Sequence, residues 1–156
     1  PEPLIQKEFS RIMSLKDGAR KMSKSELSDL SRINLTDDKD LIINKIKKAK
    51  TDPLLMPNTT KDLDERLEAK NLLGIYASLT NSTLEKNVEY FAGKNFSEFK
   101  EKLSEVLVDK IQPISLEIKK LLDDKSYLDN TLLEGVERAN IIASKKIKRI
   151  KEIVGF

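Results

Sequence analysis

Two lysines three residues apart, Lys21 and Lys24, lie in the segment Lys-Met-Ser-Lys-Ser at residues 21–25, here called the lysine segment. In a flexible loop, both ammonium groups can approach one polyphosphate while serine hydroxyls and backbone amides donate to its other oxygens. Cations beside a departing pyrophosphate lower the barrier when a carboxylate attacks the α-phosphate of ATP. The segment therefore fits nucleotidyl transfer, and the alternative is a solvated surface, where most charge runs lie.

The chain lacks the residue types that carry out much enzyme chemistry. Its 156 residues include neither cysteine nor histidine, which excludes disulfide bonds, thiolate metal sites and a histidine general base. The net charge of +3 is compatible with an anionic partner but does not identify one. Catalysis must use lysine, carboxylate, hydroxyl or backbone groups, and we expect no metal site formed by the chain itself.

The cellular location is also an expectation from composition. No apolar run is long enough to cross a bilayer, and the first residues lack a charged region followed by an apolar one. We therefore expect a cytoplasmic protein with no membrane partner. Because the chain begins at Pro1 without methionine, we expect it to be a piece of a longer product.

The elements around the lysine segment must position it. Residues 10–15 are a short apolar run that predicts a β-strand, and residues 16–18 give a turn signal. One strand is not stable alone in water, so the pattern predicts partner strands outside the chain. A helix is expected from Thr36, as N-cap, to the lysines that precede Pro53.

Helical periodicity dominates the rest of the chain. A proline-punctuated loop at residues 51–60 is the best internal boundary, and apolar residues recur at helical spacing from Asp64 onward. Pro113 is expected to kink or interrupt one helix, and a last helix is expected over about residues 129–154. Several helices joined by short loops predict an antiparallel bundle.

The amino-acid sequence of the lysine segment and its flanks resembles the sequences of one enzyme family. Lys-Met-Ser-Lys-Ser behind a strand and a glycine turn is similar to the signature loop of class I aminoacyl-tRNA synthetases. The stretches RIMSLKDGARKMSKS, DLSRINLTDD and IINKIKKAKTDP resemble the tryptophanyl type of bacteria and organelles. So do EAKNLLGIYASLT, VEYFAGKNFSEFKEKL and LLEGVERANIIASKKIKRIKEIVGF, so the resemblance covers essentially the whole chain in the family's order.

The resemblance implies a mainly α-helical chain with three parts. Residues 1–35 would be the end of a Rossmann-type catalytic domain, with one strand and the KMSKS loop, and residues 36–63 a connecting helix and proline-rich loop. Residues 64–156 would be a helical bundle of the anticodon-binding type. The family's nucleotide-binding half, with its HIGH-type signature and tryptophan pocket, is absent from these residues.

The resemblance also assigns site residues. Lys24, and after it Lys21, are the expected catalytic residues, which stabilise pyrophosphate. The backbone of Ile12 would lie against adenine, a role compatible with a core position in the strand. The expected ATP-binding residues are Ile12, Lys21, Met22, Ser23, Lys24 and Ser25. Glu26-Leu27 replaces the family's usual Asp-Pro, so the chain lacks the proline that would fix φ at this position. We expect this difference to change the mobility of the loop more than its chemistry.

The implied reaction of the whole enzyme is ATP-dependent activation of tryptophan, followed by transfer to tRNA(Trp). Mg²⁺ would accompany ATP, and the whole protein would be a homodimer, whereas this chain alone would be inactive. Arg138, Lys145 and Arg149 share one face of the last helix and are expected to contact tRNA. The alternative for these three residues is an ordinary solvated helix face.

Two other classes of function stay open. The chain could be a non-catalytic tRNA-binding or regulatory helical module derived from a synthetase, or a helical domain that only scaffolds a dimer. Salt-sensitive tRNA binding without ATP would favour the module. The lysines among residues 45–50 are explained by the helix dipole, and the alternative is a role near ATP or the tRNA acceptor end.

Overall fold

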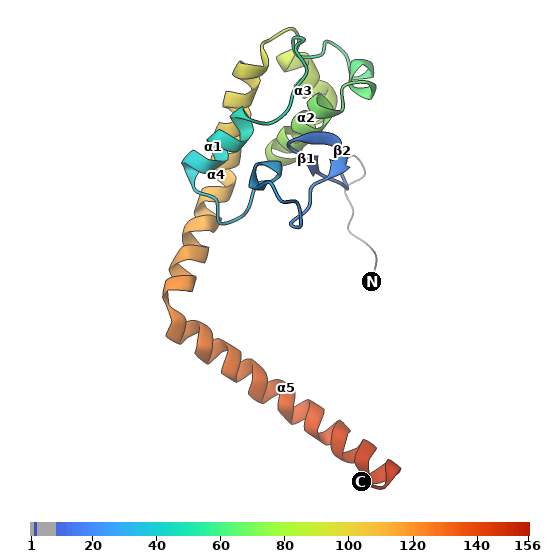
Figure 1. The fold of residues 1–156 in the computed structure, drawn as a ribbon, viewed down its shortest axis with the longest axis vertical. Coiled ribbons are helices and arrows are strands. Elements are labelled where there is room, and N and C mark those ends of the chain that lie inside the picture. The colour runs from blue at the N-terminus through green and yellow to red at the C-terminus, as the bar shows by residue number, and fades with distance from the viewer. Residues whose placement is uncertain (1, 3–8) are drawn as a thin grey trace. The chain divides into compact units, whose positions relative to one another are not determined.

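The computed structural model describes residue 2 and residues 9–156 (Figure 1). It divides into two compact units, Pro1–Ser115 and Leu116–Phe156, each of which is described by itself. The chain is mostly helical with one short two-stranded sheet. Its elements are β1 (Met13–Ser14), β2 (Asp17–Lys21), η1 (Asp29–Ser31), α1 (Lys39–Lys47), η2 (Lys61–Asp64), α2 (Leu67–Thr80), α3 (Leu84–Phe91), α4 (Phe96–Asp123) and α5 (Lys125–Val154).

The predicted strand finds its partner inside the chain, so the expectation of partner strands elsewhere was wrong for this pair. β1 pairs antiparallel with β2, with Met13 opposite Lys21 and Ser14 opposite Asp17. The chain turns at residues 15–16, and Asp17 and Gly18 belong to the second strand rather than to the turn. Local propensity indicated a turn here, but packing against α2 holds this stretch extended.

The hairpin is fastened to the start and middle of α2. The backbone N–H of Met13 donates to Oδ1 of Asn71 (2.9 Å), and Nδ2 of Asn71 donates to the carbonyl of Met13 (2.9 Å). Gly18 lies so close to α2 that an added Cβ would be 2.7 Å from the backbone nitrogen of Glu68. The side chain of Asn71 therefore satisfies backbone groups at the free edge of β1.

The first unit has one apolar core, to which all four of its α-helices contribute. Buried side chains on successive turns of α1, α2, α3 and α4 meet there, as expected for amphipathic helices. They include Ile42, Ile46, Leu72, Leu73, Val88, Phe91, Phe99 and Leu103. Tyr76 and Phe99 both contact Phe91 edge-on, with ring centroids 5.2 and 4.8 Å away. The core fixes α1 and α2, the helices on which the hairpin and the lysine segment depend.

α1 begins later than the sequence indicates. Its N-cap is Asp38, whose carboxylate accepts from the N–H of Leu41 (2.9 Å), so Thr36 is not the cap. The preceding residue, Asp37, is buried and its carboxylate is bound to other groups. At the other end, the ammonium of Lys100 donates to the carbonyls of Lys47 and Ala49, which α1 leaves without helical partners.

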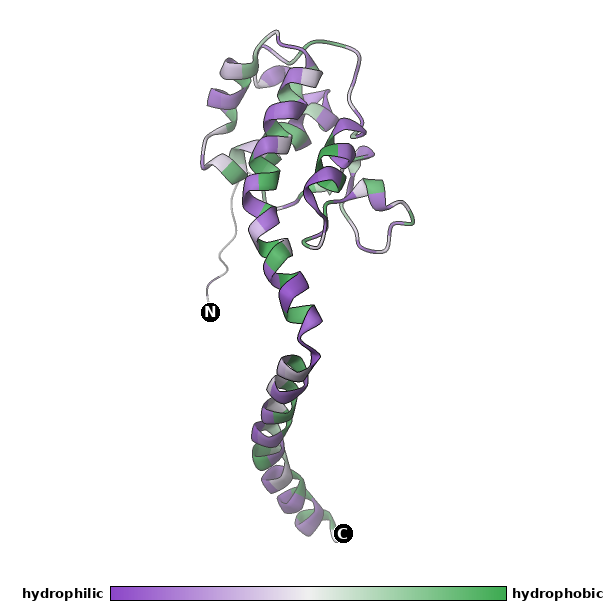
Figure 2. Cartoon of the chain, turned by 90° about the vertical axis from the view of Figure 1, so that its left-hand side faces the viewer, coloured by the Kyte–Doolittle hydropathy of each residue, from purple (hydrophilic) through white to green (hydrophobic). Residues whose placement is uncertain are grey.

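α4 is continuous through Pro113, so the expected interruption is absent. The second unit consists of the end of α4 together with α5, and α5 buries none of its side chains. Hydrophobic residues recur along α5 in Figure 2, and Leu132, Val136 and Ile147 are all more than half exposed. A bundle that extends through residue 156 therefore stays a prediction, as do the predicted domain boundaries.

None of the described helices combines the length and apolar character that a bilayer crossing requires.

Candidate functional site

The lysine segment begins in a strand and ends in a tight turn. Lys21 is the last residue of β2, where it pairs with Met13, and residues 24–25 form a turn. Within that turn Oγ of Ser23 accepts from the N–H of Ser25 (3.2 Å), and the carbonyl of Ser23 accepts from that of Glu26 (3.4 Å). The strand therefore fixes the start of the segment, and the two hydrogen bonds that Ser23 accepts hold the turn at its end.

Ile12 and Met22, both predicted ATP-binding residues, are brought together. The N–H of Met22 donates to the carbonyl of Ile12 (3.1 Å), one step beyond the last paired residues of the hairpin. Both side chains are half-buried, and Met22 packs against the apolar core of the first unit. The predicted ATP-binding residues thus form one continuous patch, with Met22 as its apolar anchor.

The polar side chains of the lysine segment face solvent. Lys21, Ser23, Lys24 and Ser25 are exposed, and within the described residues no carboxylate pairs with either ammonium group. The neighbouring guanidinium of Arg20 pairs instead with Glu26 (3.2 Å), the residue that follows the segment. One cation at the end of β2 and a second on the turn three residues later can both approach a polyphosphate or another polyanion.

Behind the turn lies a charged network that sequence reasoning missed, here called the charge cluster. It consists of Asp29, Arg32, Asn34, Asp37 and Lys45. The ammonium of Lys45 lies 2.6 Å from Oδ2 of Asp29 and 2.6 Å from Oδ2 of Asp37. Lys45 is fully buried, although it was predicted to be a lysine that complements the helix dipole. Its position between Ile42 and Ile46, on the apolar face of α1, was the available signal.

Asn34 completes the charge cluster. Its backbone N–H donates to Oδ2 of Asp37 (2.9 Å), and its side-chain amide donates to Oδ1 of Asp29 (2.9 Å). Hydrogen bonds from Lys45 and then Asn34 hold the pKa of Asp29 below its usual value, against a smaller effect of burial. The two carboxylates thus share the ammonium of Lys45 and the side-chain amide of Asn34, which satisfies the buried charges of Lys45 and Asp37.

The three predicted tRNA-binding cations lie on α5, in the second unit. Arg138, Lys145 and Arg149 are all exposed. A turn of 3.6 residues places them within about 40° of one another around the helix. The side chain of Arg138 donates weakly to the carbonyl of Glu134 one turn earlier (3.4 Å). The arrangement is a short cationic face, which can contact a phosphate backbone or only water.

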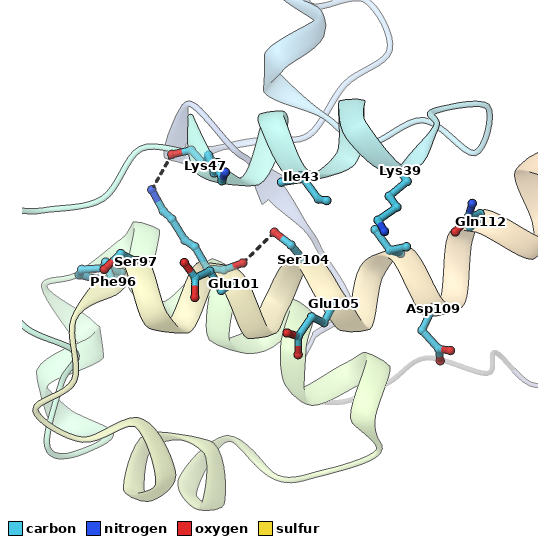
Figure 3. Close-up of a pocket in the computed structure, with 12 residues that line it drawn as sticks. Lys39, Ile43, Lys47, Phe96, Ser97, Glu101, Ser104, Glu105, Asp109 and Gln112 are labelled. Carbon is cyan, nitrogen blue, oxygen red and sulfur yellow. Dashed lines mark hydrogen bonds between the residues drawn. The ribbon is translucent and has the colours of Figure 1, made fainter.

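A separate groove of about 890 Å³ lies between α1 and α4 (Figure 3). Lys39, Ile43 and Lys47 line one side, and Glu101, Glu105 and Asp109 are among the residues from α4. Burial lowers the pKa of Lys100, which also lines the groove while its ammonium is bound to carbonyls of the α1 end. No residue of the lysine segment or of the charge cluster lines this groove.

Within the described residues no group of three or more acidic side chains could hold a metal ion.

Comparison with known proteins identifies relatives of the whole chain. A family model described as tRNA synthetases class I (W and Y) matches residues 1–112. The Tryptophan--tRNA ligase of Agrobacterium fabrum is 50% identical over 155 residues, which are 99% of this chain and 44% of that protein. The Tryptophan--tRNA ligase of Rickettsia felis is 49% identical over 156 residues, 100% of this chain and 47% of that protein. The chain therefore spans less than half the length of these relatives.

Solved structures share the fold. A tryptophanyl-tRNA synthetase from Campylobacter jejuni, complexed with ADP and tryptophan, matches with a TM-score of 0.75 at 21% identity, over 100% of this chain and 47% of that one. The enzyme from Mycoplasma pneumoniae matches with a TM-score of 0.69 at 24% identity, over 97% of this chain and 45% of that one.

Proposed function

The chain belongs to the class I tRNA synthetases of the tryptophan and tyrosine type, and from that premise we propose that it is the carboxyl-terminal part of a tryptophan--tRNA ligase. In this proposal the whole enzyme activates tryptophan with ATP and then charges tRNA(Trp), as a homodimer in the cytoplasm. The observation that carries the proposal is the 50% identity to a Tryptophan--tRNA ligase over 99% of the chain.

The proposed role of the lysine segment is to stabilise charge on pyrophosphate. A carboxylate oxygen of tryptophan attacks the α-phosphorus of ATP, the bond from that phosphorus to the bridging oxygen breaks, and pyrophosphate leaves with the bonding electrons. Lys24 supplies the main compensating cation and Lys21 the second, while Ser23 and Ser25 donate to phosphate oxygens. Both ammonium groups are exposed, and no carboxylate of the described residues pairs with them, which supports this role.

Ile12 and Met22 hold the adenine end in the same proposal. Their hydrogen bond joins the strand that would border adenine to the segment that would face the phosphates. Mg²⁺ accompanies ATP, and ATP phosphate oxygens are the ligands that suit this cation. Glu26-Leu27 departs from the family pattern, and in this proposal the loss of the proline alters the mobility of the turn and leaves the reaction unchanged.

The proposed role of the helices is tRNA recognition. The proposed whole enzyme has three parts within this chain. The catalytic domain ends with residues 1–35, a connecting helix and loop follow at residues 36–63, and the anticodon-binding helical bundle consists of residues 64–156. Arg138, Lys145 and Arg149 contact phosphates of tRNA(Trp) in this proposal. Their exposure on one face of α5 supports it.

A chimaera tests the proposed function directly. This chain replaces the matched region of the Agrobacterium fabrum Tryptophan--tRNA ligase, and tryptophan-dependent exchange of pyrophosphate into ATP is measured. The chimaera should exchange pyrophosphate, and the 156 residues alone should not. A folded, inactive chimaera that still binds tRNA would favour the non-catalytic tRNA-binding module. Robust exchange by the 156 residues alone would refute the need for the other half.

A further inference from the structure

Arg32 joins the end of the lysine segment to the charge cluster. One terminal nitrogen of its guanidinium donates to the carbonyl of Glu26 (2.9 Å), the residue that directly follows Ser25. The other lies 3.0 Å from Oδ1 of Asp29, and Nε donates to Oδ1 of Asn34 (3.2 Å). All three nitrogens of the guanidinium are therefore engaged, and one of them holds the backbone next to the turn.

One partner of Arg32, Asp29, is itself held by Lys45. Its ammonium holds both Asp29 and Asp37 from a helix that the apolar core immobilises, and its side chain is fully buried. A contiguous path of polar contacts thus runs from the core side of α1 through Asp29 and Arg32 to the carbonyl of Glu26. Buried ion pairs contribute little net stability compared with apolar residues, but they can select one arrangement of the chain.

We propose that Arg32 is a positioning residue for pyrophosphate stabilisation, which acts through Lys24 by fixing the turn that carries it, and that Lys45 anchors Arg32. The inference rests on the proposed function. Lys24 lies only two residues from Glu26, so releasing the Glu26 carbonyl frees the turn to move. A displacement of about 1 Å at a catalytic group lowers the rate about 100-fold.

A double-mutant cycle in the chimaera separates positioning from plain structural support. Arg32→Gln is combined with Lys24→Gln, and kcat and KM for ATP are measured for pyrophosphate exchange. If Arg32 acts through Lys24, Arg32→Gln should lower kcat about 10- to 100-fold alone, with a smaller change in KM. In the Lys24→Gln background it should lower kcat less than about 2-fold, because the group it positions is gone.

Arg66 provides the matched control. Its guanidinium also binds one carboxylate, that of Asp52 (2.7 and 2.9 Å), and one loop carbonyl, that of Leu55 (2.8 Å). Its side chain is 13% exposed, close to the 18% of Arg32. Arg66→Gln should therefore affect the stability of the fold about as much as Arg32→Gln does. Any effect of Arg66→Gln on kcat should be the same in the Lys24 and the Lys24→Gln backgrounds.

The outcomes distinguish the inference from the proposed function. Equal effects of Arg32→Gln in both backgrounds would overturn the inference alone. An active chimaera that Lys24→Gln leaves unchanged would overturn the proposed role of Lys24 and the inference with it, whereas a folded chimaera without exchange would count against the proposed function. If Arg32→Gln does not fold, Arg32→Lys in the 156-residue chain is used, with amide hydrogen exchange as the readout. Faster exchange at Ser25 and Glu26 with α2 unchanged supports positioning, and unchanged exchange at both amides contradicts it.

Discussion

Lys21 and Lys24 have different structural positions although their side chains are alike. The backbone of Lys21 is paired with Met13 in the hairpin, so its position is set by the sheet. Lys24 lies in the turn, where the nearest backbone restraints are the hydrogen bonds of Ser23 and the contact of Arg32 to Glu26. The position of Lys24 therefore depends on what holds the turn, whereas the position of Lys21 depends on the hairpin.

Gly18 carries a prediction at the residue scale. Gly18→Ala places a Cβ 2.7 Å from backbone atoms of Leu67 and Glu68, which cannot yield as a flexible side chain can. We expect a loss of about 1–3 kcal/mol in the free energy of unfolding, measured by urea denaturation. Gly135→Ala is the control, since its added Cβ meets nothing within 4 Å. Equal stability of Gly18→Ala and the unsubstituted chain would mean that the hairpin does not pack on α2 as described.

Residue types and the family resemblance predicted part of the candidate site. The lysine segment was found from residue types and spacing and Ile12 from the resemblance, and the structure brings Ile12 to Met22. Arg32 and Asp29 were not found, because alternating charges in a loop do not indicate which of them will pair. Lys45 could have been found, since a lysine between Ile42 and Ile46 on an apolar helix face must be buried with a counter-charge.

Among the elements, Lys50, which follows α1, links the hairpin to α2 and gives a pH prediction. The ammonium of Lys50 lies 2.7 Å from Oε1 of Glu68, and the N–H of Lys50 donates to the carbonyl of Leu15 in the hairpin. The hydrogen bond from Lys50 holds the pKa of Glu68 below its ordinary value of 4.5, and the same bond raises the pKa of Lys50.

Because the pKa of Glu68 is lowered on folding, its stabilisation is complete above pH 4.5 and is lost as the pH falls through the lowered value. Thermal unfolding of the unsubstituted chain and of Glu68→Gln should therefore differ at neutral pH. The difference should shrink as the pH falls below 4.5 and through the lowered pKa of Glu68. A difference that stays constant over this range would exclude Glu68 as the titrating group.

α5 carries a prediction about nucleic acid. If Arg138, Lys145 and Arg149 contact phosphates, the variant Lys145→Gln/Arg149→Gln should weaken tRNA binding and reduce the salt slope by about 2. The control is Lys146→Gln/Lys151→Gln, which removes the same charge from other faces of the helix and should leave the slope nearly unchanged. Fluorescence anisotropy at several salt concentrations measures both. Equal slopes for the two variants would indicate non-specific attraction to the helix.

The helices could be predicted more completely than the hairpin. Apolar spacing of 3.6 residues predicted the long helical elements, because a buried stripe of an amphipathic helix leaves that period in the sequence. β2, with the sequence DGARK, has no apolar alternation and is held extended by Met13 and by α2. A kink or an interruption was predicted at Pro113, and the interruption is absent because the proline removes only one backbone donor.

At the scale of the whole molecule, the chain corresponds to less than half of the length of its relatives. The chain covers 44–47% of the relatives named above, and α5 exposes its apolar residues as well as its cations. In our account the rest of the enzyme supplies the tryptophan pocket and most of the ATP site. In the proposed function, this chain supplies the turn that faces pyrophosphate, the charge cluster behind it and the helices that bind tRNA.

The central claim, that this chain stabilises pyrophosphate through Lys24, is tested most directly by one substitution in the chimaera. Pyrophosphate exchange is measured for Lys24→Gln beside Lys16→Gln, which removes an equally exposed lysine from the hairpin turn. Our account predicts that Lys24→Gln lowers kcat about 100-fold while Lys16→Gln leaves it within about 2-fold, with unchanged unfolding temperatures for both. Equal rates for the two variants would contradict it.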